Sequence, residues 1–125
     1  MGAKQNSNQP QTAEQLAKLL SGYSLVAAGE KRLQDSIEAV LVRESLDYKR
    51  EFSFNRKDRI DFLLGHIGLE VKVDSSPAAV LRQLFRYSEQ EAVGELLLVT
   101  TRSKHRNLPT EMNNKPVRVL YLLNL

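Results

Sequence analysis

The chain contains no cysteine, so disulfide bonds, thiolate metal sites and cysteine nucleophiles are all excluded. It also lacks any apolar run of the roughly 18 residues that a membrane-spanning helix requires, and its N-terminus has no signal-peptide pattern. The fingerprints of P-loops, dinucleotide-binding sites and nucleophilic triads are absent as well. We therefore expect a cytoplasmic protein that does not contact membranes.

What the chain does have is the composition of an ordinary globular domain. Its 125 residues are 42% hydrophobic and 26% charged, which is enough to bury a core without covalent cross-links. The formal net charge of +3 is a mild basic bias, compatible with a polyanionic partner or simply with solubility. The first eleven residues are polar, so we expect a disordered tail over residues 1–11 and a single domain over residues 12–125.

The hydrophobic pattern predicts three helices. Thr12 is a suitable N-cap for a short helix that ends near Gly22. Residues 30–44 then carry apolar side chains in steps of three and four, which is typical of one buried helix face. Pro77 is typical of a first helical turn and predicts a helix over residues 77–92.

Between and after these helices the pattern predicts strands. Apolar side chains with a period of two predict three strands, over residues 48–54, 59–64 and 67–73. Continuous apolar runs predict two more, over residues 95–101 and 117–123, with a polar loop between them. The tight connections of the first three strands favour an antiparallel meander, whereas the helix-linked third and fourth strands should be parallel. We therefore expect a single α/β sheet of mixed direction.

Three charged residues interrupt the most hydrophobic hairpin of the chain, RIDFLLGHIGLEVK. Asp61 lies on its first strand, and Glu70 and Lys72 lie two residues apart on its second strand, where facing positions come close together. Burying two unpaired carboxylates is costly, and each raises the pKa of the other. A divalent cation removes both costs, and Mg²⁺ prefers such oxygen ligands together with waters and substrate phosphates. The hairpin therefore indicates a metal site beside a lysine that can reach a bound water or a phosphate oxygen.

Asp61 followed by Glu70-Val71-Lys72 across a hairpin resembles the motif of the PD-(D/E)XK nuclease superfamily, although Ile60 stands at the position of the proline. The resemblance implies a restriction-endonuclease-like fold, which is an α/β mixed sheet in the order α-β-β-β-α-β-β, here with a short extra N-terminal helix. It also implies a metal-dependent nuclease that hydrolyses the phosphodiester bonds of DNA. In such a site Asp61, Glu70 and the Val71 carbonyl hold Mg²⁺ or Mn²⁺, and Lys72 positions the attacking water.

Many members of the superfamily add a glutamate from the first helix of the core as a further metal ligand. Glu30 and Glu38 are the two candidates in this chain. Glu30 is favoured because apolar residues follow it at Leu33 and Ile37, as is usual where this acid opens the helix, and Glu38 stays the alternative. The competing interpretation of either residue is an ordinary solvated acid.

The predicted third helix contains the sequence Gln83-Leu84-Phe85-Arg86-Tyr87. It resembles the Q-x-x-x-Y motif of the RecB-like and lambda-exonuclease-like branches of the superfamily. Gln83 and Tyr87 are four residues apart and share one helix face, from which an amide and a phenol can support metal waters and phosphate oxygens. The alternative is that Tyr87 packs in the core and Gln83 lies on the surface.

Basic residues in two places are candidates for contacts with a nucleic-acid backbone. Arg82 and Arg86 lie four residues apart on the neighbouring face of the same helix. Arg102 and Lys104 belong to a basic loop, residues 101–106, that follows the carboxyl end of a strand, where sites in α/β sheets tend to lie. Each could equally be a solvated surface residue, and DNA is the partner that the resemblance implies.

Two other hypotheses remain open at the level of sequence. The first is a catalytically silent nucleic-acid-binding or assembly module of the same fold. The second is a structural ion pair between the hairpin acids and Lys72 in an unrelated α/β protein, although buried ion pairs stabilise proteins only weakly. A homodimer is a further open alternative, since little chain lies outside the core to recognise a substrate.

Overall fold

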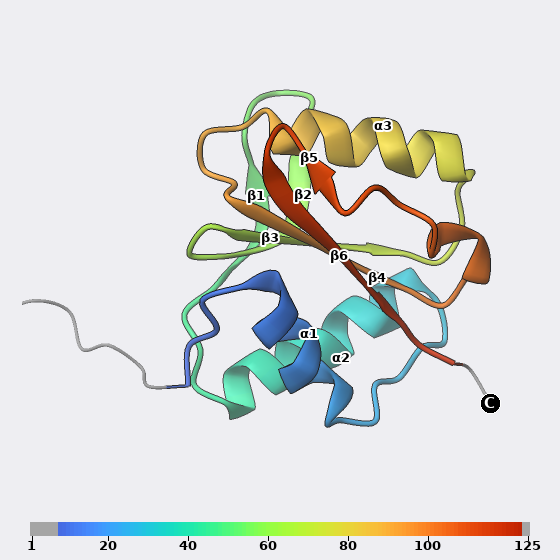
Figure 1. Ribbon diagram of the computed structural model, residues 1–125. Helices are drawn as coiled ribbons and strands as arrows, with labels where there is room; N and C mark the ends of the chain where they lie inside the picture. Colours follow the sequence, from blue (N-terminus) through green and yellow to red (C-terminus); the bar gives the residue numbers. More distant parts are fainter. Residues whose placement is uncertain (1–7, 124–125) are drawn as a thin grey trace, which may run out of the picture.

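The computed structural model describes residues 8–123 of the chain. These residues form a six-stranded mixed sheet with helices on both faces (Figure 1). The helices are α1 (Ala13–Ser21), α2 (Glu30–Arg43) and α3 (Pro77–Ser88), and the strands are β1 (Lys49–Ser53), β2 (Arg59–Leu64), β3 (Ile67–Lys72), β4 (Glu95–Thr100), β5 (Glu111–Met112) and β6 (Lys115–Tyr121). The strand order is β1-β2-β3-β4-β6-β5. The pairs β1–β2, β2–β3 and β5–β6 are antiparallel, and β3–β4 and β4–β6 are parallel. The predicted mixed α/β sheet is confirmed.

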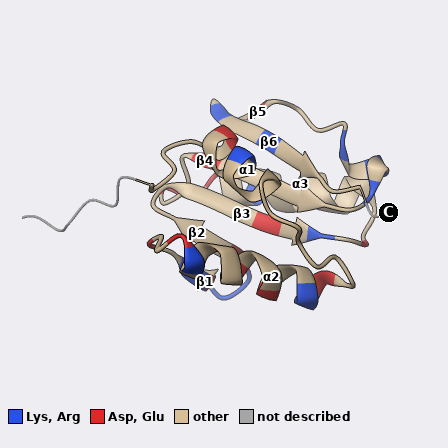
Figure 2. Cartoon of the chain, turned by 90° about the horizontal axis from the view of Figure 1, so that it is seen from below, with Lys and Arg blue, Asp and Glu red and all other residues tan. Residues whose placement is uncertain are grey.

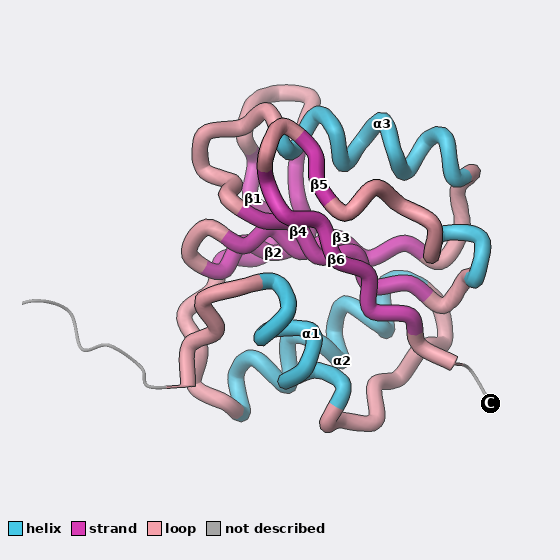
Figure 3. The backbone as a smooth tube through the Cα atoms, viewed as in Figure 1, coloured by secondary structure: helices cyan, strands magenta, loops and turns pink. Residues whose placement is uncertain are grey.

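The sheet lies between α3 on one side and α1 and α2 on the other (Figure 3). It separates two hydrophobic cores, one on each face. Helices α1 and α2 cover the face that carries Phe62, Leu69 and Leu97. Helix α3 covers the opposite face, which carries Leu96 and Leu98. Successive residues of β4 therefore enter different cores, which explains why this strand is a continuous apolar run.

The predicted helix starts are confirmed, whereas α3 is shorter than predicted. The Thr12 hydroxyl accepts from the Gln15 N–H at 3.1 Å, and the Ser76 hydroxyl accepts from the Ala79 N–H at 3.1 Å. Helix α3 ends at Ser88 instead of residue 92. It ends there because the following N–H groups bond to carbonyls three residues back, which tightens the chain and turns it toward β4.

The segment between β4 and β6 is more structured than the polar loop that the sequence predicts. It contains a short 3₁₀ turn, Ser103–His105, and strand β5. A two-residue turn joins β5 to β6, and both of its residues, Asn113 and Asn114, have positive φ, of 50° and 61°. Asparagine tolerates this backbone region and forms tight hairpins of this kind. The last strand consequently begins at Lys115, two residues before the predicted start.

The predicted disordered tail is wrong at its end nearest the domain. Gln9 exchanges two hydrogen bonds with the backbone of Asp47, and Pro10 is buried. These contacts fix the approach to α1. The rest of the predicted tail, residues 1–7, lies outside the described residues.

Strand β2 changes face in the middle, which places the candidate site. In a regular strand, residues two apart face the same side, yet Ile60 belongs to the core under α3 and Phe62 to the core under α1 and α2. The partner strand makes the same switch at Glu51, whose φ is 53°. Asp61 therefore lies at the point where β2 changes face, opposite Glu51.

No helix within residues 8–123 is long and apolar enough to span a bilayer.

Candidate functional site

The β2–β3 hairpin brings Asp61 and Glu70 together, as the facing positions predict. The Asp61 N–H donates to Glu70 Oε1 at 3.1 Å, and the Val71 N–H donates to Asp61 Oδ2 at 2.8 Å. Each carboxylate thus accepts a hydrogen bond from a backbone N–H of the facing strand. Figure 2 shows the acidic segment of β3 followed by a basic one at the end of the strand.

Glu70 and Lys72 project from the α3 face of β3. A Cβ atom at Gly68, two residues earlier, would lie 2.6 Å from Ile60 Cδ1 and 3.2 Å from Leu96 Cδ2, so this face points into the core under α3. Lys72 Nζ lies 3.3 Å from Glu70 Oε2, and the Lys72 side chain is 17% exposed while that of Glu70 is 3% exposed. The lysine is therefore the more exposed of the two side chains, and the glutamate is buried beside it.

Burial shifts the protonation of both acids. It raises the pKa of Glu70 to about 8, with the neighbouring Asp61 carboxylate adding to the rise and Lys72 opposing it. The pKa of Asp61 is also raised, first by burial, while the Val71 N–H opposes the rise and the Glu30 carboxylate adds to it. Lys72 therefore compensates the two acids only in part.

Of the two candidate helix acids, Glu30 lies near the end of β3, although it does not join Asp61 and Glu70 in one cluster, and Glu38 lies elsewhere. Glu30 Oε1 accepts from the Val73 N–H at 3.4 Å, just beyond the end of β3. Glu38 accepts instead from the Tyr48 hydroxyl at 2.8 Å and from the Arg50 guanidinium at 2.7 Å, and these donors lower its pKa. Glu38 is thus committed to a network between α2 and β1.

Gln83 and Tyr87 form a chain of hydrogen bonds that leads to Glu70. Gln83 Nε2 donates to the Tyr87 hydroxyl at 2.8 Å. That hydroxyl donates to the Arg59 carbonyl at 2.7 Å and lies 3.4 Å from Glu70 Oε2. The Tyr87 ring is fully buried, with its centroid 5.7 Å from that of Phe54, so it packs in the core and also contacts the site. Burial and Glu70 raise the pKa of Tyr87, so the phenol stays a donor.

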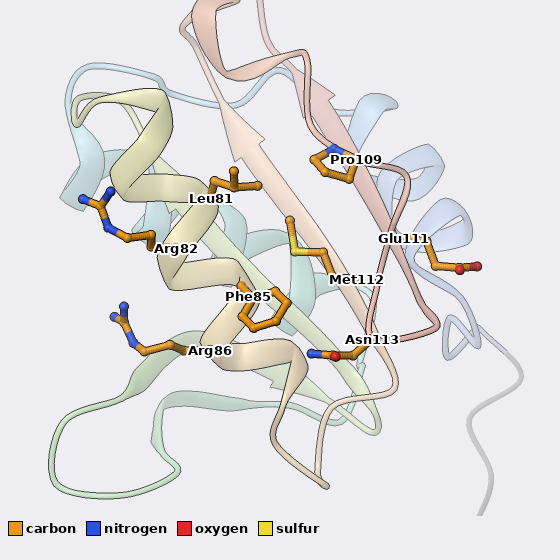
Figure 4. A pocket seen from close by; sticks show the side chains of 8 residues that line it. All are labelled: Leu81, Arg82, Phe85, Arg86, Pro109, Glu111, Met112 and Asn113. Atoms are coloured by element: carbon orange, nitrogen blue, oxygen red, sulfur yellow. The ribbon is translucent and has the colours of Figure 1, made fainter.

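The predicted nucleic-acid contacts differ in their surroundings. Both Arg82 and Arg86 are exposed, and Figure 4 shows both side chains extending from α3 away from Met112. Of these two, only Arg86 forms an ion pair within residues 8–123, with its Nε 3.0 Å from Asp58 Oδ1. Arg102 donates to the Val73 carbonyl at 2.6 Å and pairs with Asp74 at 3.1 Å. It therefore joins the loop after β4 to the segment that follows β3.

The basic loop after β4 is only partly a surface feature. Lys104 is exposed, as predicted. His105 is fully buried, with Nδ1 2.9 Å from the Thr100 hydroxyl and Nε2 2.9 Å from the Ser75 carbonyl. This histidine anchors the 3₁₀ turn, so it belongs to the packed interior and not to the exposed basic part of the loop.

The donors of the site suit a hard cation. Two carboxylates and a backbone carbonyl are oxygen ligands of the kind that Mg²⁺ uses together with waters and phosphates. Within residues 8–123, however, no three acidic, histidine or cysteine side chains are gathered closely enough to form a metal cluster, so Glu30 stands apart from the pair of acids. The fit is to a site of two carboxylates, completed by solvent or substrate.

Sequence reasoning missed the contribution of the β1–β2 turn. Asp58 is 8% exposed and pairs with Arg86, and the Arg59 carbonyl accepts from Tyr87. These contacts fix the start of β2, and hence Asp61, against α3. The available signal was the charged run Arg56-Lys57-Asp58-Arg59 beside a strand that carries a predicted ligand.

Comparison of the chain with models of protein families, with curated proteins and with solved structures finds no match.

Proposed function

We propose that the chain is a metal-dependent nuclease that hydrolyses phosphodiester bonds of DNA, on a fold of the restriction-endonuclease-like type. One observation carries the proposal: Asp61 and the buried Glu70 face each other beside Lys72, and the pKa of Glu70 is raised to about 8. A buried ion pair stabilises a protein only weakly, so stability alone gives little reason for this arrangement. Perturbed acids of this kind are typical of functional sites.

Asp61, Glu70 and the Val71 carbonyl are the groups that would hold Mg²⁺ or Mn²⁺, with Glu30 close to the end of the same strand. Such a cation, when bound, lowers the pKa of a coordinated water and stabilises charge on the scissile phosphate. The Val71 and Asp61 N–H groups orient the two carboxylates for this role.

Lys72 and Tyr87 act on the site in different ways. Lys72 is partly exposed beside Glu70, and its ammonium can donate to an attacking water or to a phosphate oxygen. Tyr87 is buried and reaches no substrate, so it is a positioning residue for Glu70 and for the start of β2. Gln83 orients the Tyr87 hydroxyl through its own amide.

A catalytically silent nucleic-acid-binding module of the same fold is the second candidate. The observation in its favour is that Lys72 pairs with Glu70 while no third acid completes a cluster within the described residues. A lysine that neutralises the glutamate would leave a stable but inactive site.

Cleavage assays with plasmid, single-stranded and branched DNA separate the two candidates. We expect cleavage by the wild type with Mg²⁺ or Mn²⁺, none with EDTA, and a loss of at least about 10²-fold in Lys72→Ala. Lys18→Ala, which changes an exposed lysine on α1, is the matched control and should cleave like the wild type. Equal background cleavage by the wild type and Lys72→Ala under all metals would refute the nuclease, and DNA binding without cleavage would establish the silent module.

A further inference from the structure

A polar pocket of about 340 Å³ lies between the β1–β2 turn and α3. It is lined by Ser53, Asn55, Arg56, Lys57, Arg59 and Gln83. Three of these side chains are cationic, three are neutral hydrogen-bonding groups, and none is acidic. This combination suits an anion that offers several oxygen acceptors.

The turn that supplies the cations is held in one shape by its own hydrogen bonds. Asn55 Oδ1 accepts from the N–H groups of Lys57 and Asp58, both at 2.8 Å. The Phe54 N–H donates to the Asp58 carbonyl at 2.8 Å and closes the turn. The backbone that carries Arg56 and Lys57 is therefore organised before any ligand binds, which lowers the entropic cost of binding.

Two contacts with α3 fix the turn in space and remove its only negative charge. Asp58 is nearly buried and pairs with Arg86 at 3.0 Å. The Tyr87 hydroxyl donates to the carbonyl of Arg59. Since Asp58 is neutralised by α3, it does not cancel the positive charge that the turn presents to the pocket.

The cations of the pocket are available to a ligand. Within residues 8–123, neither Arg56 nor Lys57 forms an ion pair, and both are exposed. Arg59 lies 3.4 Å from Glu51, but the two side chains are 63% and 56% exposed, and such a surface pair is weak.

The pocket also adjoins the candidate site through one residue. Gln83 lines the pocket and donates to the Tyr87 hydroxyl, which lies 3.4 Å from Glu70 Oε2. A DNA strand with one phosphate beside Asp61 and Glu70 would therefore bring a neighbouring phosphate to the β1–β2 turn. We propose that the β1–β2 turn, with Arg59 and Gln83, binds the phosphodiester backbone of the DNA beside the bond to be cleaved. The inference rests on the proposed nuclease function.

The test measures DNA binding in EDTA, where no cleavage occurs. The probes are a short fluorescein-labelled DNA duplex and one of its single strands, and the association constant is followed by anisotropy over a range of salt concentrations. Each phosphate contact contributes about 0.9 to the slope of log K against log salt for a duplex and about 0.7 for a single strand. The variant Arg56→Ala/Lys57→Ala should therefore lower the duplex slope by about 2.

The matched control is Lys18→Ala/Lys31→Ala, which changes exposed lysines on α1 and α2. Both double variants reduce the net charge from +3 to +1, so their long-range attraction for DNA is the same. The control should keep the wild-type slope, because its lysines lie on the helices that cover the opposite face of the sheet. Thermal unfolding of each variant checks that the fold is intact.

The outcomes separate this inference from the nuclease itself. A lower slope only in the turn variant supports the inference, even where the wild type with Mg²⁺ or Mn²⁺ cleaves nothing and the nuclease proposal fails. Equal slopes for the two double variants, or no binding of either probe by the wild type, would overturn it. Cleavage by the wild type together with equal slopes would leave the nuclease standing and place the DNA elsewhere.

Discussion

The fold disfavours the ionised form of Glu70. It is 3% exposed and faces a second carboxylate, and together burial and Asp61 raise its pKa from 4.5 to about 8. The folded chain without metal therefore carries a proton on Glu70 at neutral pH. A cation must displace this proton to bind Glu70, so its affinity for the site should rise with pH.

The stability of the metal-free protein should therefore fall as the pH rises from about 4.5 to about 8. Between these values the folded state binds a proton on Glu70 that the unfolded state has released, so deprotonation favours unfolding. The loss should be on the order of several kcal/mol. Glu70→Gln cannot ionise and should show a flatter curve, with the advantage over the wild type greatest at high pH. Urea unfolding in EDTA across this range measures both, and parallel curves would contradict the shift.

The two acids of the hairpin, Asp61 and Glu70, could be predicted from the sequence. For the acid on the helix, the sequence left two candidates, Glu30 and Glu38. Asp61, Glu70 and Lys72 follow from strand periodicity and hairpin pairing, both of which are local. The choice between Glu30 and Glu38 depends on how α2 lies across the sheet, which is tertiary. Tyr48 and Arg50, the donors that commit Glu38 to another network, lie outside its helix and cannot be recognised as partners from spacing along that helix.

At the scale of the element, the α3 face of strand β3 has no room for a side chain at Gly68. Gly68 has no side chain, and Ile60 from β2 and Leu96 from β4 fill the space that a Cβ would need. Gly68 pairs with Leu63, two positions along the hairpin from Asp61 and Glu70. The packing at Gly68 thus supports the geometry of the two acids.

Gly68→Ala should destabilise the protein by about 1–3 kcal/mol through overpacking. The new methyl group would lie 2.6 Å from Ile60 Cδ1, so that side chain must move. Gly22→Ala is the matched control, because Gly22 has an ordinary φ of −79° and its nearest atom would lie 3.4 Å away. We expect the control to change stability by less than about 1 kcal/mol, or to raise it. Chemical denaturation measures both variants, and equal effects would refute the packing argument.

Among the elements, those with a strong period could be predicted and those that depend on long-range contacts could not. The bounds of β2 match the prediction because alternation and flanking polar residues agree. Strand β5 has only two residues, too few for a period, although Asn113-Asn114 was an available turn signal. The early end of α3 is marked by the N–H groups of Glu89 and Gln90, which bond to carbonyls three residues back, and Val93 then packs in the core under α3.

In the whole molecule, the candidate site lies where the two cores meet. Glu70 reaches toward α3 through Tyr87, and Glu30 reaches the end of β3 from α2 on the other face. The switch of β2 from one face to the other at Asp61 makes this possible. No glycine marks that switch, since the positive φ falls on Glu51, so the sequence could not predict it.

Because the site joins elements from both faces, a bound cation should stabilise the whole fold. A ligand that binds only the folded state adds about 2.7 kcal/mol at a concentration of one hundred times its dissociation constant. Mg²⁺ or Mn²⁺ should therefore raise the unfolding midpoint of the wild type, and EDTA should reverse the rise. The rise should grow with pH up to about 8, because the cation competes with the proton on Glu70.

The matched variants for this measurement are Asp61→Asn and Glu38→Gln. Asp61→Asn removes a carboxylate from the pair and should abolish the rise in midpoint. Glu38→Gln changes an acid that the Tyr48 and Arg50 network holds away from the site, so it should keep the full rise even if its own midpoint is lower. A rise of the same size in both variants would mean that the cation binds elsewhere. The absence of any rise in the midpoint of the wild type, at every pH, would show that Asp61 and Glu70 do not bind Mg²⁺ or Mn²⁺.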